Sequence, residues 1–139
     1  MEIIKSVAWL YTENNKTLCV RTRGKDKFYI PGGKINKGEL PEAALIREIK
    51  EELNITLHRE SISPAVKIIA DAHGLGSDVK VEMQCYFATH TGSISANAEI
   101  EEVKWISADH LEDCAPAAIQ AIESLHERKL AYNSAHLAK

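Results

Sequence analysis

The order of apolar and polar residues along the chain predicts several short strands and two long helices. Residues 3–11 alternate loosely between the two kinds of side chain, and residues 17–22 are rich in apolar and β-branched types. Between these runs, residues 13–16 contain two adjacent asparagines, a typical turn signal. The two runs are therefore expected to pair as a β-hairpin.

Further strands are expected downstream. A short strand over residues 27–30 is expected to end at residues 31–33, because proline lacks the N–H group that a strand ladder needs and glycine weakens a strand. Three later runs of apolar and β-branched residues are expected to be strands, at residues 66–71, 79–91 and 103–106. A cluster of turn-forming residues at 73–78 is expected to be a loop.

Two helices are expected, at residues 41–53 and 115–129. The first begins with a proline, which the first turn of a helix tolerates, and is followed by Asn54, a residue type that ends helices in the left-handed conformation. Residues 131–139 are expected to fray. Because strands and helices are mixed without a linker or repeat, the chain is expected to be a single domain over residues 1–139 with an α/β (α+β) sandwich fold.

Composition and charge narrow the possible functions. The 139 residues, 45% apolar and 27% charged, suit one globular domain. A net charge of −3 gives no general attraction to nucleic acid or to an anionic membrane, so neither is expected as a partner. The three widely spaced cysteines, Cys19, Cys85 and Cys114, exclude a zinc knuckle or a disulfide framework. They favour the cytoplasm, as does the lack of a signal-peptide pattern or a long apolar segment.

Three glutamates gather on one side of the helix expected at residues 41–53. On a helical wheel, Glu48, Glu51 and Glu52 lie within about 100° of one another. The neighbouring face is apolar and is expected in the core: Leu45, Ile46, Ile49 and Leu53. Like charges at these spacings cost a helix a few tenths of a kcal/mol per pair. One interpretation is a solvated acidic face. The other is a bound cation, and carboxylate oxygens favour Mg²⁺ or Mn²⁺ over zinc.

The spacing of the wider segment resembles a known motif. Gly33, then Glu39 after five residues, then residues 47–55 after seven more, is similar to the signature box of the Nudix hydrolases, with eight of its nine fixed positions matched. Asn54 stands where the family usually has glycine. Asparagine is the next-best residue for a left-handed position, so the helix end is expected to survive. Residues 30–33 and the glutamate-rich segment before Trp105 extend the resemblance to most of the chain.

The resemblance implies a fold and a reaction. The fold is a mixed β-sheet between helices that carries a loop–helix–loop catalytic motif. The reaction is hydrolysis of a nucleoside diphosphate linked to another group, with Mg²⁺ (or Mn²⁺) as the cofactor. Such a reaction needs positive charge on the phosphate oxygens and an activated water, which metals held by carboxylates supply.

The resemblance also implies roles for the residues of the box. Glu51 and Glu52 correspond to metal ligands, and Glu48 corresponds to a further ligand or to the general base. Arg47 would orient Glu51 or its neighbours through a charge-assisted hydrogen bond. Gly33, or Gly32 beside it, would offer a backbone carbonyl to the metal, and Glu39 would be structural or an outer ligand.

A late segment resembles another part of the family's metal site. Residues 97–105 are similar to the loop in which an acidic residue often completes that site. At most one or two of its glutamates are expected to face the metals. The candidates are Glu99, Glu101 and Glu102, and Glu101 is chosen as the metal ligand.

Substrate contacts are expected from the strand that precedes the glycine loop. Arg21 and Arg23 alternate along an extended segment and so would share one face of the sheet. One interpretation is a clamp for substrate phosphates. The other is a row of charges that protects a sheet edge. Tyr29, beside the loop, is a candidate for stacking on a base.

The resemblance therefore implies a pyrophosphohydrolase that cleaves a nucleoside triphosphate, such as 8-oxo-dGTP or another modified one, to monophosphate and pyrophosphate. Its partner would be a small nucleotide, and the chain would act as a monomer or homodimer. In this family, ADP-ribose enzymes tend to carry a proline, and dinucleoside-polyphosphate enzymes a tyrosine, at fixed distances beyond the box. Those positions hold Asp71 and His73 here, so neither marker is present and both classes are weakened. Two alternatives stay open: an ADP-ribose or nucleotide-sugar pyrophosphatase, and a nucleotide-binding module without catalysis.

Overall fold

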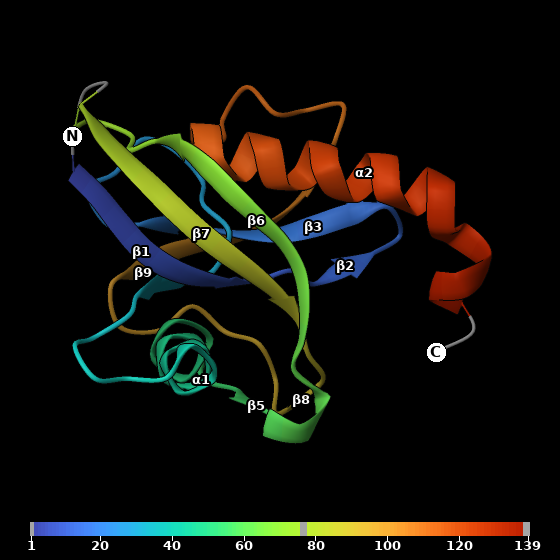
Figure 1. Ribbon diagram of the computed structural model, residues 1–139, viewed down its shortest axis with the longest axis horizontal. Helices are drawn as coiled ribbons and strands as arrows, with labels where there is room; N and C mark the ends of the chain where they lie inside the picture. The colour runs from blue at the N-terminus through green and yellow to red at the C-terminus, as the bar shows by residue number, and fades with distance from the viewer. Residues whose placement is uncertain (1, 76–77, 138–139) are drawn as a thin grey trace.

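The structure is a computed structural model that describes residues 2–75 and 78–137. It shows strands and helices mixed along the whole chain (Figure 1). In chain order, the elements are β1 (Glu2–Trp9), β2 (Thr12–Glu13), β3 (Lys16–Thr22), β4 (Gly32–Lys34), α1 (Pro41–Leu53), β5 (Thr56–Leu57), the 3₁₀ turn η1 (Arg59–Ser61), β6 (Ser63–Asp71), β7 (Val79–Phe87), β8 (His90–Thr91), β9 (Ile100–Ser107) and α2 (Pro116–Leu137).

A mixed four-stranded sheet forms the centre of the fold, in the order β4-β1-β7-β6. Strands β1 and β7 are parallel, whereas β4 and β6 run antiparallel to their neighbours. Strands β2, β3 and β9 form a second, antiparallel sheet. Helix α2 packs against β6 and β7, and α1 packs against β1, β4 and β5 on the other side (Figure 1). The expected α+β sandwich, with a mixed sheet between helices, is confirmed.

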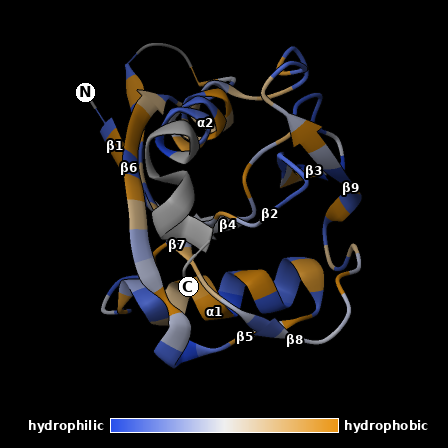
Figure 2. Cartoon of the chain, turned by 90° about the vertical axis from the view of Figure 1, so that its right-hand side faces the viewer, coloured by the Kyte–Doolittle hydropathy of each residue, from blue (hydrophilic) through white to orange (hydrophobic). Residues whose placement is uncertain are grey.

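The central sheet separates two apolar clusters, one under each helix. The predicted core face of α1 is confirmed, because Leu45, Ile49 and Leu53 are fully buried and Ile46 packs at the margin of the same cluster. Figure 2 shows this helix with apolar and polar residues on different sides. Burying one leucine or isoleucine side chain of this kind stabilises the fold by about 2 kcal/mol. The packing therefore fixes which face of α1 points away from the core.

The expected hairpin between residues 3–11 and 17–22 is wrong in its first strand. Strand β1 pairs with β7 and β4, and not with β3. The strand that forms a hairpin with β3 is β2, around a turn in which Asn14 and Asn15 have left-handed φ angles of 53° and 63°. Leu10 still donates to the carbonyl of Tyr86 in β7 at 2.9 Å. The predicted turn is thus confirmed, but residues 3–9 of the apolar run belong to the central sheet and not to the hairpin.

The expectation that a strand over residues 27–30 ends at residues 31–33 is also wrong. Residues 27–30 form only isolated bridges, whereas residues 32–34 are strand β4, antiparallel to residues 6–8 of β1. Pro31 does not interrupt this pairing, because it contributes only its carbonyl, which accepts from the Trp9 N–H at 2.9 Å. The glycine segment therefore forms an edge strand of the central sheet.

The later strands differ from expectation at their ends. Strands β6 and β9 each begin three residues earlier than predicted. The single strand predicted over residues 79–91 is divided into β7 and β8. The pairing of β7 with β1 ends at Trp9 and Tyr86. Beyond it, the Thr89 carbonyl accepts from the His58 N–H at 2.9 Å, and β8 pairs with β5. The loop expected at residues 73–78 joins β6 and β7, and its residues 76–77 lie outside the described part.

Helix α2 is longer than the sequence predicted. It continues to Leu137, beyond the expected end at residue 129, since residues 130–137 contain neither glycine nor proline. The fraying of residues 131–139 stays a prediction, and residues 138–139 lie outside the described part. Within residues 2–75 and 78–137, no helix is both long and apolar enough to cross a membrane.

Candidate active site

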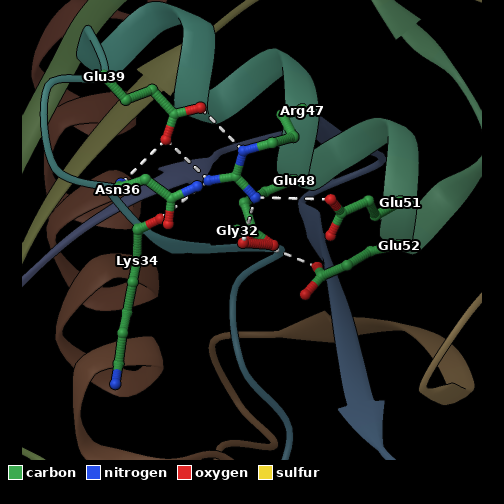
Figure 3. A network of polar contacts seen from close by, with 8 residues as sticks. All are labelled: Gly32, Lys34, Asn36, Glu39, Arg47, Glu48, Glu51 and Glu52. Atoms are coloured by element: carbon green, nitrogen blue, oxygen red, sulfur yellow. Dashed lines mark hydrogen bonds and ion pairs between the residues drawn. The ribbon is translucent and has the colours of Figure 1, made fainter.

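The candidate site lies where α1 packs against β4. Helix α1 has the bounds that the sequence predicted, and Asn54 after it has φ 58° and ψ 36°. This is the left-handed conformation for which asparagine substitutes for glycine, so the helix ends as expected. The acidic face of the helix points toward the glycine segment (Figure 3).

Gly33 is the residue over which the Glu48 carboxylate lies. A Cβ at position 33 would be 2.4 Å from Glu48 Oε2 and 2.5 Å from Glu48 Cδ. Only 17% of the Glu48 side chain is exposed. Glycine is needed here because the carboxylate approaches the backbone so closely.

Replacing Gly33 with alanine is expected to lower kcat about 10-fold or more, because the new methyl group would take the place of the Glu48 carboxylate and a misplaced catalytic group is costly. The melting temperature should change little, since the Glu48 side chain can rotate outward. Steady-state kinetics on the best nucleotide substrate would check this, with exposed Lys37→Ala as the control. An unchanged kcat in Gly33→Ala would show that the position of Glu48 does not matter.

Gly32 holds a second carboxylate. Its N–H donates to Glu52 Oε1 at 3.1 Å. Its φ is 151°, and a Cβ there would lie 2.0 Å from the carbonyl oxygen of Val7. Only glycine lets β4 approach β1 this closely. This position of the backbone places the Gly32 N–H within hydrogen-bonding distance of the Glu52 carboxylate.

Burial raises the pKa of Glu52 to about 8, and the charges of Glu48 and Glu51 add to this effect, while the hydrogen bond from Gly32 opposes it. Burial also raises the pKa of Glu48, against the opposing effect of Arg47. The charged forms of Glu48 and Glu52 are thus disfavoured, and a cation between the two carboxylates would stabilise them. Such groups are typical of functional sites.

Arg47 connects α1 to the loop that precedes it (Figure 3). Its Nε and Nη2 donate to the two carboxylate oxygens of Glu39 at 2.8 and 2.9 Å, a bidentate pair. Nη2 also donates to the Lys34 carbonyl at 3.2 Å. Nη1 donates to Glu48 at 3.2 Å and lies 3.5 Å from Glu51 Oε1. Arg47 therefore contacts Glu51, as its predicted orienting role requires.

Two roles are predicted for Glu39, a structural one and that of an outer metal ligand. Its contacts suit the structural role. Besides Arg47, it accepts a hydrogen bond from the Asn36 N–H at 2.9 Å. The hydrogen bonds from Arg47 lower the pKa of Glu39 to about 2, so the pair stays charged at neutral pH. Its carboxylate joins the turn at residues 36–39 to the middle of α1.

The donor set fits a hard divalent cation. Glu48, Glu51 and Glu52 offer carboxylate oxygens from one helix face. Burial, and to a smaller extent the charges of Glu48 and Glu51, raise the pKa of Glu52, and a bound cation would favour its charged form. Among residues 2–75 and 78–137, no three or more His, Cys, Asp or Glu side chains are already gathered as a metal site. Arg47 contacts Glu48 and Glu51, and Gly32 holds Glu52. The ligand roles of these glutamates and of the Gly33 carbonyl stay predictions.

The late glutamates contact an arginine of the neighbouring strand. Arg21 Nη2 lies 3.2 Å from Glu102 Oε1 and 3.6 Å from Glu101 Oε2. The carbonyl of Glu99 accepts from the Arg23 N–H at 2.8 Å. The ligand role of Glu101 stays a prediction, and Arg21 is its partner in this structure.

A pocket of about 320 Å³ opens beside the acidic helix. Gly32, Gly33 and Glu52 line it together with Tyr29, whose ring centroid lies 6.2 Å from that of His73. The structure thus brings Tyr29 to the same cavity as the acidic helix. A volume of this size is sufficient for a small-molecule ligand.

Arg21 and Arg23 are not among the residues that line this pocket. Strand β3 contributes Val20 and Thr22 instead, on either side of Arg21, and Arg23 lies in the turn after the strand. Arg21 lies beside Glu101 and Glu102, and Arg23 Nη1 donates to the Ala98 carbonyl at 3.4 Å. The structure therefore does not bring the two arginines together with Tyr29, and their substrate role stays a prediction.

Sequence reasoning missed part of the pocket wall. Asp71 and His73, at the end of β6 and just after it, line the pocket, as does Thr22. In the sequence, Asp71 and His73 stand where the family's substrate markers are absent. Their distance from the box was the available signal, because substrate markers of the family occur at that distance.

The fold and this helix-borne acidic site define a class of protein. The chain matches the NUDIX domain over residues 4–127 and belongs to that family. Nudix hydrolases act on phosphoric anhydride bonds.

Individual relatives are similar to different extents. An 8-oxo-dGTP diphosphatase of Escherichia coli (strain K12) is 40% identical over 55 residues, which cover 37% of this chain and less than half, 43%, of that protein. The crystal structure of a MutT NUDIX hydrolase from Burkholderia pseudomallei is 21% identical with a TM-score of 0.74, and the match covers 89% of this chain and 98% of that one. The solution structure of the E. coli ORF135 protein is 23% identical with a TM-score of 0.72, over 100% and 96% of the two chains. These two structures show the shared fold.

Proposed function

We propose that the chain is a Mg²⁺- or Mn²⁺-dependent pyrophosphohydrolase that converts a nucleoside triphosphate, normal or modified, to monophosphate and pyrophosphate. The observation that carries this proposal is the position of Glu52. It sits on the acidic face of α1, accepts from the Gly32 N–H, and lines a pocket of about 320 Å³. The acidic face and the cavity therefore adjoin at one residue, as cleavage of an anhydride next to a nucleoside requires.

Each residue has a proposed role in this reaction. Glu51 and Glu52 hold the cation, which, when bound, offsets the charge on the phosphate oxygens and activates a water. Glu48 is a further ligand or accepts the proton of that water, a role that its raised pKa suits. Arg47 orients Glu48 and Glu51, and Tyr29 stacks on the base.

The choice of a triphosphate is supported by two observations. The short match to an 8-oxo-dGTP diphosphatase gives one such precedent, though only over 43% of that protein. Asp71 and His73 also leave the chain without the markers of ADP-ribose and dinucleoside-polyphosphate enzymes. The alternatives are an ADP-ribose or nucleotide-sugar pyrophosphatase and a binding module without catalysis. The complete set of box acids argues against the module. We also propose that the chain acts in the cytoplasm, as a monomer or homodimer.

A nucleotide panel with Mg²⁺ tests this proposal. It should include the normal nucleoside triphosphates, 8-oxo-dGTP, ADP-ribose and a nucleotide sugar, with products separated by chromatography. We expect the fastest turnover for a triphosphate, with one pyrophosphate released per monophosphate. Faster turnover of ADP-ribose would favour the first alternative, and binding without turnover would favour the second.

The phosphate-clamp role of Arg21 and Arg23 is testable by Arg→Lys substitution at each site. Lysine keeps the charge but cannot reproduce the bidentate geometry of a guanidinium on a phosphate. If either arginine holds the substrate, its lysine variant should raise KM several-fold without changing the melting temperature. Wild-type KM and kcat in both variants would remove Arg21 and Arg23 from the site.

A further inference from the structure

The last turn of α1 is held by a segment more than forty residues further along the chain. The N–H of Ser95 donates to the Leu53 carbonyl at 3.1 Å, and the N–H of Asn97 donates to the Glu52 carbonyl at 3.0 Å. The side chain of Asn97 adds a third bond, because its Nδ2 donates to the Glu51 carbonyl at 3.1 Å. These three carbonyls therefore receive donors from the loop before β9.

These bonds satisfy acceptors that an isolated helix leaves open. The last four carbonyls of an α-helix have no partner within the helix. Asn54 supplies a local bond only to Lys50, one residue before the carbonyls that the loop contacts. The helix end is thus completed by tertiary contacts, two of them from a single residue, Asn97.

The carbonyls that Asn97 holds belong to two of the candidate metal ligands. Glu51 and Glu52 project their carboxylates from the same residues whose carbonyls are fixed. The direction of a Cα–Cβ bond follows the orientation of its backbone, so fixing both carbonyls fixes where both carboxylates start. Glu51 gains most from this, because more than half of its side chain is exposed and its carboxylate contacts Arg47 at 3.5 Å.

The loop that contains Asn97 is itself held on its other side. The Arg23 N–H donates to the Glu99 carbonyl at 2.8 Å, and Arg23 Nη1 donates to the Ala98 carbonyl at 3.4 Å. Asn97 therefore lies between a helix end and the end of β3. Hydrogen bonds link Asn97 to α1 on one side and its neighbours Ala98 and Glu99 to Arg23 on the other.

We infer that Asn97 is a positioning residue for the metal site: its side-chain and backbone donors hold the last turn of α1 so that the Glu51 and Glu52 carboxylates converge on one divalent cation. This inference rests on the proposed function, because it concerns the same cation. It adds a residue outside the signature box, from the loop before β9. Groups that orient metal ligands typically change metal affinity or activity 10- to 100-fold when removed.

The test compares Asn97→Ala and Asn97→Asp with wild type. Both variants keep the backbone N–H, and both lose the Nδ2 donor; aspartate keeps the size of the side chain. Ser93→Ala, at an exposed position of the same loop, is the matched control. Three quantities are measured: the Kd for Mn²⁺ alone by electron paramagnetic resonance, the melting temperature without metal, and kcat and KM for the best nucleotide.

We expect both Asn97 variants to bind Mn²⁺ about 10-fold more weakly and to lose about 10-fold in kcat, with KM within two-fold of wild type. Ser93→Ala should match wild type in every measurement. A residue with only a structural role would lower the melting temperature but leave the Mn²⁺ affinity unchanged, and that result would overturn the inference. If wild type itself bound no Mn²⁺ and turned over no nucleotide, the proposed function would fail as well.

Discussion

Glu52→Gln is expected to lower kcat by about 10²-fold or more and, at the same time, to raise the melting temperature of the metal-free protein. The loss of activity follows from removing one negative ligand from a site that needs it for a cation. The gain in stability follows from the cost of burying an ionised carboxylate, to which the charges of Glu48 and Glu51 add. Glutamine keeps the oxygen that accepts from the Gly32 N–H, so the shape of the site should be preserved.

The stability gain should depend on pH in a definite direction. The pKa of Glu52 is about 8 in the folded protein and about 4.5 when unperturbed. Folding therefore favours the protonated form, and this contribution to stability is complete below about pH 4.5 and is lost as the pH rises through 8. The difference between Glu52→Gln and wild type should grow over this range to the order of a few kcal/mol.

Thermal unfolding of both proteins between pH 5 and 9, with and without Mg²⁺, checks the prediction. Mg²⁺ should raise the melting temperature of wild type by mass action and affect Glu52→Gln much less. Exposed Glu60→Gln serves as the control for loss of one charge. If Glu52→Gln were less stable than wild type across the whole range, Glu52 would be a structural residue and its ligand role would be wrong.

Arg47→Ala is the substitution with the second largest expected effect, a loss of about 10- to 100-fold in kcat together with about 2 kcal/mol of stability. Arg47 is bound bidentately by Glu39 and contacts both Glu48 and Glu51. Without Arg47, Glu48 and Glu51 lose the guanidinium group that both of them contact. The loop at residues 36–39 also loses its connection to α1.

The matched control is Lys50→Ala, which removes an exposed positive charge from the same helix. It should leave kcat within two-fold of wild type. Arg47→Lys separates charge from geometry, because lysine cannot make the bidentate contact with Glu39 and should recover only part of the loss. The orienting role of Arg47 would be refuted by an Arg47→Ala variant that melts at a lower temperature yet keeps the wild-type kcat.

Local features of the sequence were sufficient to predict the centre of the site. Helix α1 has the predicted bounds because its proline, its apolar spacing and Asn54 act within a few residues of each other. The shared acidic face of Glu48, Glu51 and Glu52 follows from helix periodicity alone. These parts of the fold needed no knowledge of distant partners.

The errors concern partners that are distant in sequence. The hairpin predicted for residues 3–11 rests on residues 17–22 being the nearest strand, yet β1 pairs in parallel with β7, about seventy residues further on. The glycine segment was predicted to end a strand, but the close approach of Gly32 to Val7 makes it an edge strand. Nothing local to either segment reveals these pairings. For the same reason, the bonds of Asn97 to α1 could not be foreseen from the sequence.

The dependence of pyrophosphate release on Mg²⁺ tests the central claim most directly. Wild-type protein is given its best triphosphate, and the initial rate of pyrophosphate release is measured as Mg²⁺ is raised from zero and again after excess EDTA. We expect no release without Mg²⁺, a rate that rises to saturation as Mg²⁺ is added, and a complete stop with EDTA. A rate that is indifferent to Mg²⁺ and EDTA would contradict a metal site on α1, and no release from any triphosphate would contradict the proposed activity.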